Sequence, residues 1–166
     1  CYSVFSTIWH AAELQLYQIS ENFEYSIDLS SVRINEIQVA NIDQYIDNSY
    51  NYGGWIELYN TSPVMCTLEN AKIRHTDMDG IVEEYTLDLS HGLIKGHGYA
   101  CLWFDHNSAD GTFGEKAYMQ IPFKMDPEGG LIELLDADGN VVDAVMYPSA
   151  IARCAYARIT DGDELW

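Results

Sequence analysis

The sequence predicts an all-β protein, a two-sheet β-sandwich of about eight or nine strands. From residue 32 onward, short apolar runs follow one another, and turn signals such as Asp-Gly separate them. No long stretch repeats its apolar residues with the 3.6-residue period of a helix. A sandwich is expected because two packed sheets hide both apolar faces in one core.

The expected strands are short runs of alternating or continuous apolar character. They span residues 32–39, 55–60, 67–75, 81–89, 98–104, 117–123, 130–136, 141–147 and 155–159. Asp79-Gly80 and Asp138-Gly139 predict tight hairpin turns, because Gly tolerates the positive φ that such turns demand. The clearest hairpin covers residues 131–147.

The 166 residues are enough for one domain, which we place at 32–166. Residues 13–31 are expected to form an extended lead-in. Residues 1–12 carry no formal charge and resemble the end of a secretory signal peptide. The alternative makes Cys1 the lipid-bearing first residue of a lipoprotein. Either interpretation predicts a secreted or cell-surface protein, and no other segment approaches the roughly 18 apolar residues of a membrane span.

The charge balance is strongly acidic. Eight Lys and Arg stand against 26 Asp and Glu, a formal net charge of −18. Such a surface repels phosphate backbones and anionic membranes, because basic side chains drive binding to both. We therefore expect no nucleic-acid partner.

The four cysteines show neither a CxxC motif nor the Cys/His spacing of structural zinc. Cys101 lies in the alternating run YACLWF, where a buried free thiol is the ordinary interpretation. A disulfide between two of Cys66, Cys101 and Cys154 is the alternative.

Several motifs together resemble the lamin tail domain family in its bacterial form. They are Ile34-Asn35-Glu36-Ile37, Trp55-Ile56-Glu57-Leu58-Tyr59-Asn60, Leu68-Glu69-Asn70-Ala71, the turn 94–99, Phe123-Lys124-Met125, the hairpin 134–143 and Ala157-Arg158-Ile159-Thr160-Asp161-Gly162 with Trp166. The resemblance covers residues 32–166, although Ala157 replaces the Gly common in the family. It implies an immunoglobulin-like β-sandwich without known catalytic activity, used as an accessory domain in larger secreted or surface proteins.

Glu36 and Glu57 are the acids that most suggest chemistry, since each lies in an apolar run. As a functional pair they could be the acid and nucleophile of a glycosidase, which needs two carboxyls about 5 to 9 Å apart across a cleft. The favoured interpretation is structural. It places them on neighbouring strands, one capping loop amides and one pairing with Arg33, Lys72 or Arg74.

No metal site and no cofactor are predicted. Asp136, Asp138 and Asn140 resemble a calcium loop superficially, but the Gly and Glu of an EF-hand are misplaced, so a hairpin turn is favoured. Weak calcium binding by acids of the long loops is the alternative. The acids concerned are Asp43 with Asp47 and Asp105 with Asp110.

Tyr45, Tyr50 and Tyr52 cluster in the loop 40–54 beside Trp55. They predict a rim that binds a protein or a carbohydrate, because tyrosine supplies large contact area at low entropic cost. The alternative is a loop that folds back over the sheet edge through its own aromatic residues.

These observations favour a non-catalytic module of a secreted or surface protein, for protein interaction or as a structural spacer. The second hypothesis is a carbohydrate-binding or accessory domain of a secreted hydrolase. An enzyme in its own right is the weakest of the three. The partner itself, protein or glycan, cannot be named from the sequence, because such sandwiches carry specificity in loop shape.

Overall fold

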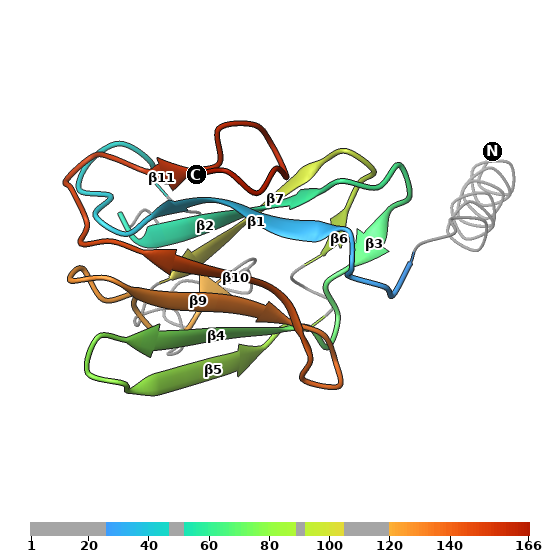
Figure 1. The fold of residues 1–166 in the computed structure, drawn as a ribbon, viewed down its shortest axis with the longest axis horizontal. Coiled ribbons are helices and arrows are strands. Elements are labelled where there is room, and N and C mark those ends of the chain that lie inside the picture. The colour runs from blue at the N-terminus through green and yellow to red at the C-terminus, as the bar shows by residue number, and fades with distance from the viewer. Residues whose placement is uncertain (1–25, 47–51, 89–91, 105–119) are drawn as a thin grey trace, which may run out of the picture.

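The computed structural model describes residues 26–46, 52–88, 92–104 and 120–166. These residues form an immunoglobulin-like β-sandwich with eleven strands and no helix, which confirms the predicted all-β class (Figure 1). The proposed signal remnant 1–12 and most of the lead-in 13–31 lie outside the described residues. So does Tyr50. None of the described segments is a helix with the length and apolar character needed to cross a membrane.

The first layer is a five-stranded sheet in the order β11-β1-β2-β7-β8. Its strands are β1 (Val32–Gln38), β2 (Gly54–Asn60), β7 (Tyr99–Phe104), β8 (Gln120–Ile121) and β11 (Tyr156–Ala157). All neighbours are antiparallel except β7 and β8, which are parallel.

The second layer is a four-stranded antiparallel sheet in the order β10-β9-β4-β5. Its strands are β4 (Lys72–Asp77), β5 (Val82–Thr86), β9 (Gly130–Leu135) and β10 (Val141–Tyr147). A short two-stranded sheet pairs β3 (Cys66–Thr67) with β6 (Leu93–Ile94).

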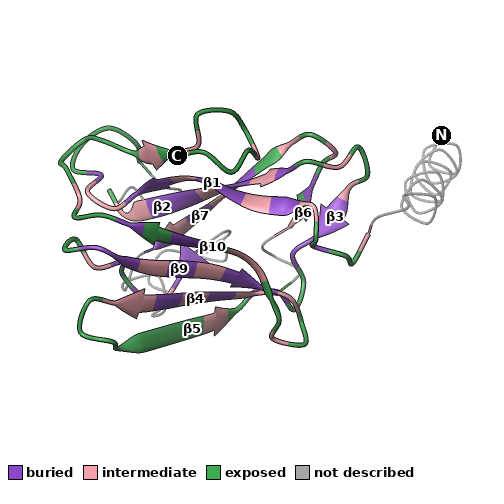
Figure 2. Cartoon of the chain, viewed as in Figure 1, coloured by how far each residue is buried: buried purple, intermediate pink, exposed green. Residues whose placement is uncertain are grey.

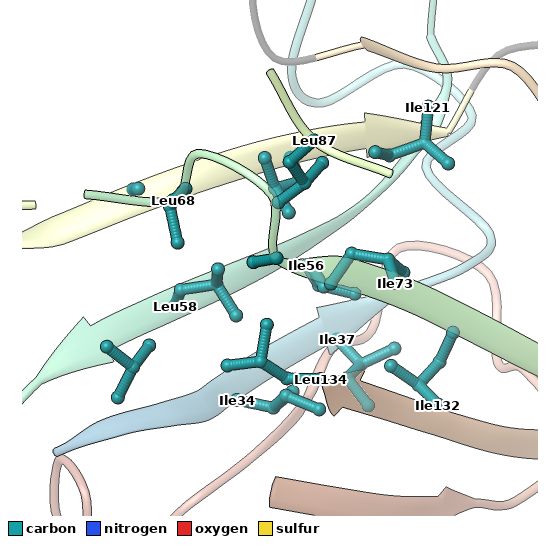
Figure 3. Packing of buried hydrophobic residues seen from close by; sticks show 14 of the residues in the cluster. Ile34, Ile37, Ile56, Leu58, Leu68, Ile73, Leu87, Ile121, Ile132 and Leu134 are labelled. Carbon is teal, nitrogen blue, oxygen red and sulfur yellow. The ribbon is translucent and has the colours of Figure 1, made fainter. Parts of the chain in front are cut away.

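The core lies between the two large sheets, where alternate residues of each strand meet (Figure 3). On β2, Ile56 and Leu58 are fully buried in it, whereas Glu57 and Tyr59 project from the other face. Ile73 and Leu134 enter from the second sheet. Each such side chain stabilises the fold by about 1.5–3 kcal/mol when it is fully buried.

A β-bulge interrupts this alternation on β1. The register with β2 shifts between Ile34 and Glu36, so Asn35 and Glu36 both leave the core side. The core residues Ile34 and Ile37 keep their inward positions on either side of the bulge. The bulge therefore turns Asn35 outward, towards the face of the five-stranded sheet that points away from the core.

The predicted strand 67–75 is wrong in one respect, because the structure divides it into β3 and β4. Between them Asn70 adopts φ 65°, a left-handed conformation that Asn tolerates better than most residues. Leu68 and Ala71 remain fully buried, so the apolar run reflects a buried turn. Strand β6 was not predicted, and β5 and β11 are shorter than the runs that contain them. Strand β8 ends at Ile121, two residues before the predicted end, and residues 117–119 of that run lie outside the described residues.

The predicted hairpin 131–147 is confirmed as β9 and β10. Gly139 takes φ 88° in its turn, and Asp136 accepts hydrogen bonds from the backbone and side-chain nitrogens of Asn140. These bonds lower the pKa of Asp136. Asp136 therefore stabilises the hairpin turn by accepting these hydrogen bonds.

The three described cysteines are free thiols. Cys66 is buried beside β6, Cys101 is half-buried on β7, and Cys154 is exposed. The favoured interpretation of free thiols is confirmed for these three.

Candidate interaction surface

The outward face of the five-stranded sheet carries most of the residues singled out by the sequence. Its side chains form three rows across β1, β2 and β7. The rows are Gln38, Trp55 and Trp103; Glu36, Glu57 and Cys101; and Arg33, Tyr59 and Tyr99. The face thus has an aromatic end, a carboxylate centre and a tyrosine end.

Asn41 organises the loop that follows β1. Its side chain is buried and donates to the backbone oxygens of Tyr45 (2.7 Å) and Gly53 (3.0 Å). The same side chain accepts from the backbone nitrogens of Gln44 and Tyr45. One amide therefore holds both ends of the loop together.

Tyr45 rests edge-on against Trp55, with ring centroids 5.9 Å apart and planes at 84°. Trp55 itself is only 8% exposed, and its indole nitrogen donates to Gln38 at 2.8 Å. Gln38 in turn donates to Gln44 at 2.6 Å. The loop does fold back over the sheet. Trp55 acts as the buried support of Tyr45, so the binding role predicted for it can only be indirect.

Among the described residues of this loop, four large apolar side chains nevertheless remain exposed. Ile42 and Tyr45 are each 55% exposed, Ile46 is 51% exposed and Tyr52 is 45% exposed. We call these four residues the loop patch. Tyr45 and Tyr52 are therefore accessible as the sequence predicts.

The loop acid Asp43 is occupied by a cation of the protein. Arg153 donates to both of its carboxylate oxygens, at 2.6 and 2.5 Å, and these bonds lower the pKa of Asp43. Its proposed calcium partner Asp47 lies outside the described residues, as do Asp105 and Asp110. Among the described side chains no group of three or more His, Cys, Asp or Glu is placed to hold a metal ion.

Glu36 and Glu57 lie directly opposite each other on β1 and β2, as expected for neighbouring strands. The pKa of Glu36 is raised by burial and then by the charges of Glu57 and Asp161. Burial, together with the charges of Glu57 and Glu36, also raises the pKa of the Cys101 thiol to about 12. The centre of the face is thus an acidic patch beside a thiol that stays protonated.

The partners predicted for the two glutamates are wrong. Glu57 accepts a hydrogen bond from the side chain of Asn35 at 3.0 Å. Lys72 and Arg74 contact Glu84 in the other sheet, and Arg33 donates to backbone oxygens near its own position.

The tyrosine end is fixed by Asn35 and Asp161. The Asn35 amide donates to Asp161 at 2.9 Å and accepts from the Gly162 nitrogen at 3.0 Å. Tyr99 donates to the other oxygen of Asp161 at 2.5 Å, which raises the pKa of Tyr99 to about 12 and lowers that of Asp161. The rings of Tyr59 and Tyr99 lie 4.9 Å apart. This network ties the C-terminal segment to the face.

Glu36 and Glu57 are directly opposite on adjacent strands, so their side chains project from the same face of the sheet. One carboxylate oxygen of Glu57 is hydrogen-bonded to Asn35, which agrees with the structural interpretation of this acid. That the pair has no catalytic role stays a prediction that this geometry does not test, since a glycosidase also needs a cleft that places the scissile bond between its two carboxyls.

No protein-family model and no curated protein matches this chain. The assignment to the lamin tail domain family therefore stays a prediction.

Sequence reasoning missed the residues that order this surface. Three buried polar residues do so: Gln38 at the end of β1, Asn41 in the loop after it, and Asn35 in its bulge. Their partners lie up to 127 residues away. Ile42 and Ile46 were also missed as surface residues. The only local signal was Asn41 near the start of the loop that follows β1, since Asn side chains often hydrogen-bond the backbone of turns and loops.

Proposed function

We propose that this chain is a non-catalytic β-sandwich module of a secreted or surface protein, and that it binds a protein partner through the loop patch. The observation that carries the proposal is the exposure of Ile42, Tyr45, Ile46 and Tyr52 on one loop that Asn41 and Trp55 hold in place. Exposed apolar side chains whose backbone is already held by such contacts bind with little additional loss of entropy.

The two isoleucines favour a protein over a glycan. Carbohydrate sites combine flat aromatic rings with hydrogen-bonding side chains, whereas aliphatic side chains beside tyrosines are typical of the apolar centre of protein interfaces. The acidity of the chain disfavours an anionic membrane as the target of the same side chains.

The second candidate is carbohydrate binding, as an accessory domain of a secreted hydrolase. Its support is the edge-on contact of Tyr45 with Trp55, which leaves more than half of Tyr45 exposed next to the amide of Gln44. Residues 32–166 resemble the lamin tail domain family, which supports the extracytoplasmic, non-catalytic part of both candidates.

The test compares three forms of the chain, the wild type, the double variant Ile42→Ser with Ile46→Ser, and the variant Tyr45→Ala. Immobilised wild-type chain captures proteins from the secreted and surface fraction of its source cells, and calorimetry then measures binding to the purified candidate. We expect the double variant to weaken binding by roughly ten-fold or more, the effect of losing a hot spot.

The matched control is Ile159→Ser, because Ile159 is 74% exposed outside the loop patch. It should leave the affinity unchanged. Saturable binding to a glycan array that Tyr45→Ala abolishes and the double isoleucine variant retains would favour the carbohydrate candidate. Turnover of a glycoside by the isolated chain, lost in Glu57→Gln, would contradict both.

A further inference from the structure

Strand β5 forms an open edge of the four-stranded sheet. It pairs with β4 on one side, and no described strand pairs with its other side. Val82, Glu83, Glu84 and Thr86 are exposed and Tyr85 is half-buried. Figure 2 shows this exposure along most of β5, at the margin of the molecule. The residues that precede it continue the pattern, since Met78 is 67% and Ile81 62% exposed.

The hydrogen bonds to β4 identify which amides of β5 face outward. The backbone N–H of Asp77 donates to the carbonyl oxygen of Ile81 at one end of the strand pair. At the other end, the backbone N–H of Leu87 donates to the carbonyl oxygen of Ala71. Hydrogen-bonded residues alternate along an antiparallel pair, so residues 81, 83, 85 and 87 face β4. The N–H and C=O groups of Val82, Glu84 and Thr86 therefore face away from the sheet.

The exposed side chains along this edge change from apolar to acidic in chain order. Ile81 and Val82 are an exposed apolar pair, and Glu83 and Glu84 are an acidic pair directly after it. Arg74 and Lys72 contact Glu84 at 2.9 and 3.9 Å. Glu83 has no ion-pair partner among the described side chains, so its charge is available to an incoming strand.

A second copy of this chain is a poor occupant of the edge. Antiparallel pairing of two β5 strands would bring acidic pairs together between two chains of net charge −18. A segment that places lysine or arginine opposite the acidic pair would instead be attracted to it.

We propose that the β5 edge binds an extended basic segment of a partner protein by strand addition, with two consecutive basic residues beside the acidic pair, the second of them opposite Glu83, unpaired among the described side chains, and two apolar residues opposite Ile81 and Val82. The backbone of the segment would bond to the outward groups of Val82, Glu84 and Thr86. Antiparallel pairing is the stronger geometry, so the segment reads basic pair first and apolar pair second along its chain.

The probe is a capped synthetic peptide, Ser-Thr-Lys-Lys-Val-Val-Thr-Ser, added to the ¹⁵N-labelled chain. The expected result is saturable binding that slows hydrogen exchange at the amides of Val82, Glu84 and Thr86. The amides of Glu83 and Tyr85 already bond to β4, so they serve as internal controls. The same peptide with both lysines replaced by glutamate should bind about ten-fold more weakly or worse, because like charges would meet.

Two variants separate backbone pairing from charge. Val82→Pro removes one outward N–H at the first residue of an edge strand, where proline is tolerated, and should abolish the new protection. Val82→Thr keeps that N–H and should bind as the wild type does. Glu83→Lys should reverse the preference between the lysine and glutamate peptides, and circular dichroism verifies the fold of each variant.

Three results would overturn the proposal. They are the absence of saturable binding of the lysine peptide up to about 1 mM, equal binding of the two peptides, and chemical shift changes confined to the loop patch. Self-association through β5, seen by sedimentation and lost in Val82→Pro, would assign the edge to a second copy instead. None of these outcomes bears on the loop patch, so the proposed function is tested separately.

Discussion

The two lateral edges of the sandwich differ in whether side chains bond to their outward backbone groups. At one edge β10 lies beside β1, near the short strand β11 (Figure 1). There Ile34 donates its N–H to Asp143 at 2.7 Å, and its carbonyl accepts from Arg158 at 2.7 Å. A pair of side chains thus replaces a neighbouring strand. At the β5 edge, no side chain in the described part of the chain bonds to the outward groups.

The closing pair is itself tightly held. Arg158 donates to Asp143 at 2.9 Å and also to the Asp163 oxygen, and its side chain is only 5% exposed. Its guanidinium lies 4.8 Å from the centroid of the Trp166 ring, and Trp166 stacks on Tyr156. Asp143 and Arg158 belong to two of the motifs that carry the family resemblance. The comparison suggests that one edge is closed for stability and the other is left open for a partner.

The largest effect is expected for Arg158→Ala. This change removes the cation of a buried ion pair, so Asp143 loses its ionic partner and the Ile34 carbonyl loses its hydrogen-bond donor. We expect the free energy of unfolding to fall by about 3 kcal/mol. Urea denaturation measures it. The control is Arg153→Ala, since the pair of Arg153 with Asp43 is exposed to solvent and should contribute far less than the buried pair. Equal losses in the two variants would show that the edge is not closed by Arg158.

The next effect concerns Asn35, which joins the bulge of β1 to the C-terminal segment. Asn35→Ala removes hydrogen bonds to Glu57, Asp161 and the Gly162 nitrogen from a buried position, so we expect a loss of about 2 kcal/mol. Asn140→Ala removes one side-chain bond to Asp136 at an exposed hairpin turn and should cost less than half as much. The Tyr99 phenol should also titrate closer to 10 in Asn35→Ala if the network holds Asp161 in place.

A smaller, pH-dependent effect is expected next to the open edge. His75 of β4 is buried and shares a 2.8 Å hydrogen bond with Tyr147. Burial lowers its pKa below 6.5, although the charges of Glu83, Asp77 and Asp126 oppose that shift. The unfolded chain then binds the proton more readily, so stability is complete above pH 6.5 and falls as the pH drops below it. Urea unfolding at pH 7.5 and 5.5 measures the loss, and His75→Gln should reduce it. A rise in stability on acidification that disappears in His75→Gln would reverse the assignment.

The smallest effect is a gain in stability. Glu36 faces Glu57 directly across β1 and β2, and its pKa is raised above 4.5. Its ionisation therefore destabilises the fold as the pH rises through that raised pKa. Glu36→Gln should stabilise the chain by about 0.5 kcal/mol at pH 7, the scale of a cross-strand charge pair, and by less at pH 4. A loss of stability at pH 7 would show that Glu36 has a favourable partner.

The strands were largely predictable because their signal is local. Ile56 and Leu58 alternate with Glu57 and Tyr59, and this alternation alone assigns their faces. The division at Asn70 was not predictable, since nothing in an apolar run shows that one residue takes a left-handed conformation. Strand β6 has only two residues, too few for any periodicity.

The site was predictable in part. Aromatic clustering located Tyr45 and Tyr52 correctly on an exposed loop. It could not show that Trp55 would be buried beneath Tyr45, because burial depends on how the loop folds back. The pairing of Asp143 and Arg158 with Ile34 joins positions 109 and 124 residues apart. Such contacts follow from topology and leave no pattern in the sequence.

Native-state hydrogen exchange tests the contrast between the two edges most directly. The account predicts a slowly exchanging amide at Ile34, whose donor bonds to Asp143, and rapidly exchanging amides at Val82, Glu84 and Thr86. In Asp143→Ala the Ile34 amide should exchange rapidly while the β5 amides stay as they are. Strong protection at Val82, Glu84 and Thr86 in the isolated chain, or an Ile34 amide that remains slow in Asp143→Ala, would contradict it.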